Sequence, residues 1–186
     1  MIDLTAALIR RLRAFGRDER GVISIEFVIW MPLILAVMAS TFTLFEAFRQ
    51  KSLNIKAAYT ISDAISRETD PIDAAYLDGM LSVLRFLADS DGSYGLRVTL
   101  VRYDANSDTH EVGWSQARGE FVTMDDDMLA GLRDRLPALL HNERVIVVET
   151  ETEHTPVFEI PALQPQSFYN FVFTRPRFAP QIVWAG

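Results

Sequence analysis

Two groups of acidic side chains are the first candidates for chemistry in this sequence. The run Asp125–Asp127 could coordinate a divalent cation through its carboxylate oxygens. The spacing of a calcium-binding loop is absent, so we interpret the run as the acidic first turn of a helix, where carboxylates interact favourably with the helix dipole. Glu149, Glu151 and Glu153 alternate along a predicted strand and could offer paired carboxylates for acid–base catalysis. We expect them instead to form a solvated face or a charged edge of the sheet.

The other reactive side chains form no recognisable catalytic or metal-binding pattern. His110, His141 and His154 have no histidine partner three or four residues away, and we expect them to be surface or hairpin residues. No serine lies in a nucleophile elbow, and there is no glycine-rich phosphate loop. The sequence has no cysteine, which excludes disulfides, zinc–thiolate sites, iron–sulfur clusters and thiol catalysis. We therefore expect a protein that is not an enzyme and that needs no metal or other cofactor.

One further carboxylate, Glu26, lies in the most apolar part of the sequence. The run from Val22 to Phe45 is long enough to cross a membrane as a helix, because at about 1.5 Å per residue it covers roughly 36 Å. A charge inside such a helix is costly. The run could be a secretory signal peptide cleaved between Ala39 and Ser40, or an uncleaved anchor in which Glu26 has no role.

A third interpretation links Glu26 to Gly21. A cut after Gly21 would place a new α-ammonium group on Val22, one helical turn from the Glu26 carboxylate. In an assembly of such helices, the amine of one subunit could neutralise Glu26 of its neighbour, so that the pair sets the axial register.

The charge distribution predicts how the chain is oriented. Residues 1–21 contain five arginines and three acidic residues, which gives a net charge of +2. Because the whole chain has a net charge of −7, the remaining residues carry −9. A basic head before an apolar run places the N-terminus in the cytoplasm. The acidic remainder argues against a nucleic-acid partner, because phosphates would repel it.

The segment RDERG-VISIEF, which starts at Arg17, resembles the prepilin peptidase site of type IV pilin-like proteins. With the MPLIL run that follows, it looks most like the TadE/TadG-type pseudopilins of tight-adherence (Flp) pili. The resemblance covers about Arg17 to Phe45. It implies that Gly21 is the last leader residue and Val22 the processed N-terminus. Glu26, followed by Phe27, would act in assembly.

The resemblance implies a minor pilin or pseudopilin-like structural subunit. Its expected partners are a prepilin peptidase, other pilins or pseudopilins, an inner-membrane pilus assembly platform and the membrane itself. It would be a single-pass protein of the bacterial inner membrane, with its N-terminus in the cytoplasm and its body in the periplasm or outside the cell. It could also be incorporated into the pilus. The alternative is a membrane-anchored periplasmic binding or enzymatic domain with the helix as a simple tether. A tether predicts that Gly21 and Glu26 are replaceable and that the body has a pocket with convergent polar groups.

These residues must be positioned by three regions: a leader over residues 1–21, a long helix over 22–68 with its transmembrane segment at 22–45, and an extracytoplasmic domain over 69–186. Asp70 is a candidate cap for the helix after Pro71. Apolar periodicity predicts the domain's elements: helices over Ile72–Ala88 and Thr123–Leu140, and strands over Leu96–Tyr103, His110–Gln116, Arg144–Thr152 and Ser167–Thr174. The fold class is α+β, a small antiparallel sheet with helices on one face. The aromatic C-terminal strand is expected in the core or, alternatively, at a contact with another subunit.

Overall fold

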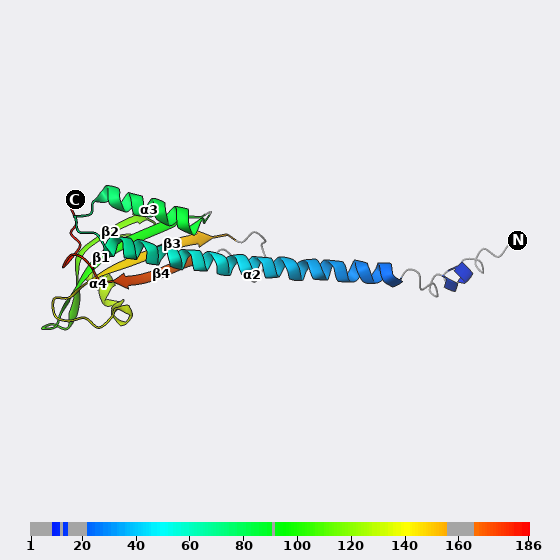
Figure 1. Cartoon of the computed structure of the whole chain (residues 1–186). Helices are drawn as coiled ribbons and strands as arrows, with labels where there is room; N and C mark the ends of the chain where they lie inside the picture. The colour runs from blue at the N-terminus through cyan, green and yellow to red at the C-terminus, as the bar shows by residue number, and fades with distance from the viewer. Residues whose placement is uncertain (1–8, 12, 15–21, 91, 156–165) are drawn as a thin grey trace. The chain divides into compact units, whose positions relative to one another are not determined.

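The computed structural model describes residues 9–11, 13–14, 22–90, 92–155 and 166–186. The chain divides into two compact units, Met1–Phe42 and Thr43–Gly186. Helix α2 (Val22–Ser66) begins in the first unit and ends in the second. The second unit, which we call the body, adds seven elements (Figure 1): α3 (Ala74–Ala88), β1 (Tyr94–Asp104), β2 (Thr109–Gly119), α4 (Asp126–Ala130), the 3-10 turn η2 (Arg133–Arg135), β3 (Arg144–His154) and β4 (Gln166–Thr174).

Helix α2 confirms the predicted long helix almost to the residue at both ends. It continues through Pro32, which lacks a backbone donor and usually breaks helices in water. In the apolar half, the hydroxyls of Ser40 and Thr41 donate to the carbonyls of Ala36 and Val37, at 2.8 Å each. Hydroxyl groups satisfied within the helix suit surroundings without water.

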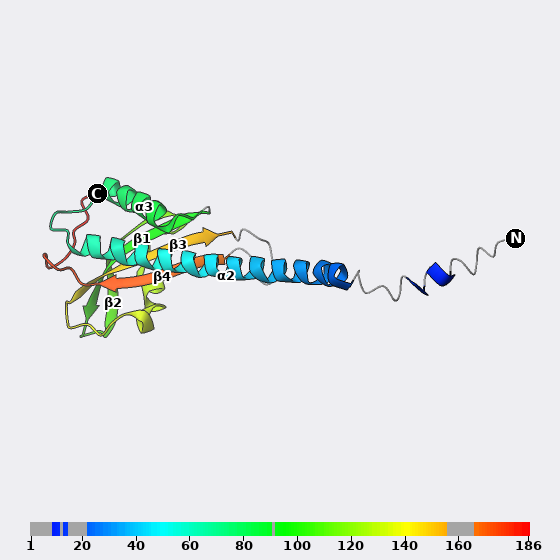
Figure 2. The same cartoon turned by 45° about the vertical axis from the view of Figure 1, so that its right-hand side comes forward.

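The body confirms the α+β class with one antiparallel four-stranded sheet in the order β2-β1-β3-β4. The second part of α2 runs alongside this sheet in both views (Figure 1, Figure 2). On β1, Leu100 pairs with Trp114, whereas Val101 pairs with Val112. Gly113 is therefore the extra residue of a β-bulge on β2.

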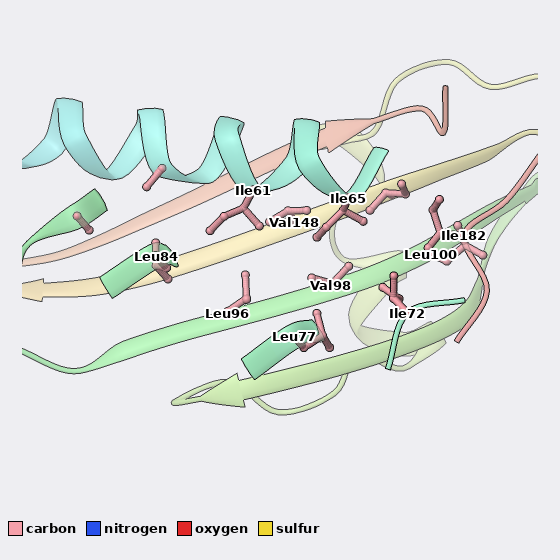
Figure 3. Packing of buried hydrophobic residues seen from close by; sticks show 13 residues of the cluster. Ile61, Ile65, Ile72, Leu77, Leu84, Leu96, Val98, Leu100, Val148 and Ile182 are labelled. Carbon is pink, nitrogen blue, oxygen red and sulfur yellow. The ribbon is translucent and has the colours of Figure 1, made fainter. Parts of the chain in front are cut away.

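The main core lies between the sheet and the helices α2 and α3. Alternate residues of β1, starting at Leu96, meet apolar residues that recur every turn of α2. Figure 3 shows Ile61 and Ile65 of α2 beside Val148 of β3, with Leu77 of α3 next to β1. Leu84 of α3 belongs to the same cluster. Apolar residues recur at every second position in the strands and at about every fourth position in the helices. Each element therefore has one apolar face, and these faces pack against one another.

The opposite face of the sheet carries a second, smaller core, so helices lie on both faces rather than on one. Val101, Val145 and Val147 alternate along their strands with residues of the main core, so they point to the opposite face of the sheet. There they pack with Met124 and Leu129.

The helix predicted over Thr123–Leu140 is wrong in length, because only α4 and η2 form. Asp125 caps α4 by accepting a hydrogen bond from the Met128 amide, and the helix stops at Gly131. Glycine is a poor helix former, and Pro137 forces the residue before it, Leu136, into an extended conformation. Two helix-breaking residues therefore outweigh the leucine periodicity.

The helix predicted over Ile72–Ala88 starts two residues later than expected, at Ala74, and Asp70 is not its cap. Asp73 caps α3, with its side chain accepting from the Tyr76 amide. Ile72 is buried in extended conformation and exchanges backbone hydrogen bonds with Val183 and Ala185, at 2.9 Å each. Pairing with the C-terminal segment thus removes Ile72 from the helix.

Candidate functional site

The structure places Val22 and Glu26 on the same helix, and Gly21 lies outside the described residues. Val22 is the first residue of α2. Residues four apart in an α-helix share a face, about 6 Å apart along the axis. The geometry that the processing interpretation requires, with an N-terminal amine one turn from the carboxylate, is therefore available in α2.

Apolar side chains surround Glu26 and are turned outward. Ile25, Phe27 and Trp30 are 61%, 62% and 57% exposed. Within the described residues, α2 is one helix long enough and apolar enough to cross a membrane. Its exposed surface over residues 24–38 would be covered by lipid or by other apolar helices, because water would hydrate it at a high free-energy cost.

Glu26 is exposed and has no hydrogen-bond or ion-pair partner in the part of the chain that the structure describes. Glu26 is also the one charged residue of the sequence between Val22 and Phe45. A lone carboxylate in such a helix can accept hydrogen bonds from an ammonium group, and this attraction strengthens where water is excluded. The arrangement suits docking of a cation rather than catalysis.

The other acidic candidates are structural. Asp125 caps α4, and Asp126 accepts a hydrogen bond of 2.7 Å from the Val112 amide of β2. Asp126 and Asp127 form the acidic first turn, as expected. Within the described residues, no three or more histidine or acidic side chains are grouped to hold a metal ion.

Glu149 corrects the expectation of a solvated acidic face. It is fully buried, and the Arg97 guanidinium donates to both its oxygens, at 2.6 and 2.7 Å. The Tyr169 hydroxyl donates to it as well, at 2.6 Å, and burial together with this carboxylate raises the pKa of Tyr169. The Arg97 guanidinium also lies 5.0 Å from the ring centre of Phe121. The sequence pattern did not reveal this ion pair, because Glu149 alternates with Glu151 and Glu153 as in a solvated face. The pairing follows from the β1–β3 register, in which Arg97 is directly opposite Glu149.

The three histidines lie in different surroundings. His141 is exposed, 3.3 Å from Asp104, as expected of a surface residue. His154 is buried and stacks on Phe168, which contradicts the surface expectation. His110 is half-buried beside Tyr103, and burial lowers its pKa.

The aromatic C-terminal region lies partly in the core, as expected, and is partly exposed. Phe171 packs in the second core and Trp184 against the main core. Tyr169, Phe173 and Phe178 keep 40% to 65% of their surface exposed. A hollow of about 430 Å³, which the sequence did not indicate, lies near Trp184 and is lined by two arginines and a glutamate, Arg102, Arg144 and Glu111.

Comparison with known proteins adds no relative: no protein-family model, no curated protein and no solved structure matches the chain. The resemblance to TadE/TadG-type pseudopilins therefore depends on the segment from Arg17 to Phe45 alone.

Proposed function

We propose that this protein is a minor pilin or pseudopilin-like subunit of a tight-adherence pilus. A prepilin peptidase removes the basic leader after Gly21, the apolar half of α2 stores the subunit in the inner membrane, and the body lies outside it. Glu26 then meets the new N-terminal amine of a neighbouring subunit. The protein works by assembling with other pilins on a membrane platform, and it catalyses no reaction.

One observation carries this proposal: a carboxylate without a partner among the described residues lies one turn into an outward-facing apolar helix, directly after a basic leader in the sequence. An anchor alone needs no carboxylate, and insertion of an acidic residue into lipid is unfavourable. Pairing with an ammonium group offsets that penalty and favours one axial register between helices.

Processing is tested by the intact mass of the protein purified from its native cells. We expect a chain that starts at Val22. Gly21→Arg should block the cut, whereas Gly16→Arg, a matched change in the leader, should leave it unaffected. A chain that starts at Ser40 would mean an ordinary secreted domain. An intact Met1 in a working protein would exclude the pilin proposal.

Assembly is tested separately with Glu26→Gln, which keeps the shape of the side chain and removes its charge. This variant should be processed normally but remain in the membrane fraction instead of reaching sheared surface fibres. Glu46→Gln is the matched control, because Glu46 lies on the same helix beyond the apolar run and pairs with Arg49. Assembly that proceeds equally well with both variants contradicts a role for Glu26.

The second candidate is a binding domain in the periplasm that α2 merely tethers. The hollow near Trp184 favours it, because a tether account requires a pocket with convergent polar groups in the body. Under this account Glu26→Gln and Gly21→Arg both leave the function intact.

A further inference from the structure

The hollow of the body lies on the same face of the sheet as the main core. It occupies about 430 Å³ next to the β-bulge at Gly113. Leu100 and Gly113 contribute to its lining from the strands, and the C-terminal segment around Ile182 contributes from the other side. All of its residues belong to the body and are described by the structure.

Three charged side chains cross this hollow in a row. In the strand register, Arg102 of β1 is directly opposite Glu111 of β2 on one side and Arg144 of β3 on the other. Residues opposite one another in neighbouring strands point to the same face of the sheet. Arg102 donates a hydrogen bond to Glu111 and forms an ion pair with it.

Arg144 is left without an anionic partner among the described residues. The neighbouring carboxylate of Glu143 is already occupied, because it pairs with Arg175 at 2.5 Å and accepts from the Leu140 amide at 2.6 Å. Two like charges directly opposite one another in a sheet are destabilising. With Glu111 committed to Arg102, the hollow carries one positive charge that no described residue compensates.

The apolar wall of the hollow is held in place. The Trp114 indole donates to the Ile182 carbonyl at 2.9 Å, and its ring centre lies 5.8 Å from that of Trp184. Both rings line the hollow. A fixed aromatic wall beside an unpaired guanidinium is preorganised for a ligand that is apolar at one end and anionic at the other.

We propose that the hollow binds a single carboxylate carried on an apolar or aromatic group. The Arg144 guanidinium holds the carboxylate, for which its planar fork is suited, and the apolar group lies against Trp114 and Trp184. One net positive charge favours a monoanion over a phosphate dianion. The carboxylate could belong to the end of a peptide chain or to a small organic acid. The inference does not depend on processing after Gly21.

The test uses the full-length protein in detergent micelles with ¹⁵N-labelled tryptophan. The sequence contains three tryptophans, so three indole signals report on Trp30, Trp114 and Trp184. We expect 3-phenylpropionate to shift the Trp114 and Trp184 signals and to leave Trp30 unchanged. Its uncharged amide, acetate and inorganic phosphate should each bind at least ten-fold more weakly.

Variants decide whether Arg144 is the anchor. Arg144→Gln should weaken 3-phenylpropionate binding at least ten-fold, and Arg144→Lys should weaken it less because the charge remains. Arg85→Gln is the matched control, because Arg85 lies over Tyr94 and does not line the hollow. The affinity of this variant for 3-phenylpropionate should stay within two-fold of the wild-type value. Well-resolved Trp114 and Trp184 signals in the ligand-free variant, together with a thermal melt like that of the wild type, show that the body of a variant is folded.

Equal binding of 3-phenylpropionate and its amide, or undiminished binding by folded Arg144→Gln, would overturn the proposal. N-acetyl-phenylalanine, which mimics a peptide end, distinguishes the two sources of the carboxylate. Tighter binding than 3-phenylpropionate supports a peptide end, and equal or weaker binding supports a small acid. A protein that fails to be processed but binds these acids would refute the proposed function and leave this site standing.

Discussion

At the scale of single residues, the body depends on a buried ion pair that does not contribute to any site. Arg97 and Glu149 are almost completely shielded from water and joined by two hydrogen bonds. Removing two charges from water is expensive, so the pair stabilises the fold only weakly while it is intact. Removing one partner destabilises the fold strongly, because the remaining charge stays buried without a partner.

We therefore predict that Glu149→Gln lowers the free energy of unfolding by about 3 kcal/mol. Glu151→Gln, on the same strand, should lower it by less than about 1 kcal/mol, because Glu151 is partly exposed. Urea unfolding of the full-length protein in mild detergent measures both. The double variant Arg97→Met/Glu149→Leu should recover most of the loss, since it leaves no lone charge. Equal effects of the two glutamate changes would contradict this account.

At the scale of elements, the contact between α2 and the sheet changes character along the helix. Its later part packs through apolar residues such as Ile61 and Ile65. Its earlier part packs through polar ones: buried Asn54 accepts a hydrogen bond from the Thr152 hydroxyl, and its amide donates to the Gln50 carbonyl. A buried polar contact of this kind fixes the position of the helix along β3, because a shift would leave both groups unpaired.

Thr152→Val tests this contact, because it keeps the β-branched shape and removes the donor. We expect a loss of about 1–3 kcal/mol in the free energy of unfolding. Amide exchange over residues 50–58 of α2 should also become faster. Thr174→Val is the control, since Thr174 lies on β4 without a side-chain hydrogen bond to any described residue, and it should change stability by less than about 0.5 kcal/mol. The contact has no fixing role if exchange in α2 is the same in both variants.

The sequence predicted the elements whose signals are local. The apolar run and the helical period after it predicted α2, and alternation over Arg144–Thr152 predicted β3. Features that depend on partners distant in the chain were missed. Glu149 appeared solvated because its partner Arg97 is 52 residues away, and the charge row at Arg144 depends on a register that no local pattern contains. The length of α4 was wrong because two helix breakers outweighed a regular leucine spacing.

At the scale of the whole molecule, the chain combines an apolar half-helix with an acidic body. The net charge is −7 although residues 1–21 contribute +2, so the body is strongly anionic. Such a body is repelled by anionic lipid head groups, and copies of it repel one another in solution. In the proposed assembly, contacts between bodies must overcome this repulsion, and neutralisation at Glu26 supplies part of the compensation.

The pH dependence of stability follows from the direction of the shifted pKa values. Hydrogen bonds from Arg67 and Arg133 lower the pKa of Asp63 and Asp108 from the ordinary 3.8. Burial, with a smaller contribution from the Arg133 charge and opposed by the Asp108 charge, lowers the pKa of His110 from 6.5. In each case the unfolded chain takes up a proton at a higher pH than the folded one. All three groups therefore stabilise the fold above their unfolded pKa and lose that contribution as the pH falls.

We accordingly predict a decline in the thermal midpoint that begins near pH 6.5 and a second decline below about pH 4. The first arises from His110, whose two ring nitrogens are buried without a hydrogen-bond partner in the described parts of the chain. A circular dichroism melt of the full-length protein between pH 8 and 5 should therefore be less pH-dependent in His110→Gln than in the wild type. His141→Gln, which changes an exposed histidine, should retain the wild-type slope. An unaltered slope in His110→Gln would assign the first decline to another group, because the unfolded chain would then gain its proton elsewhere.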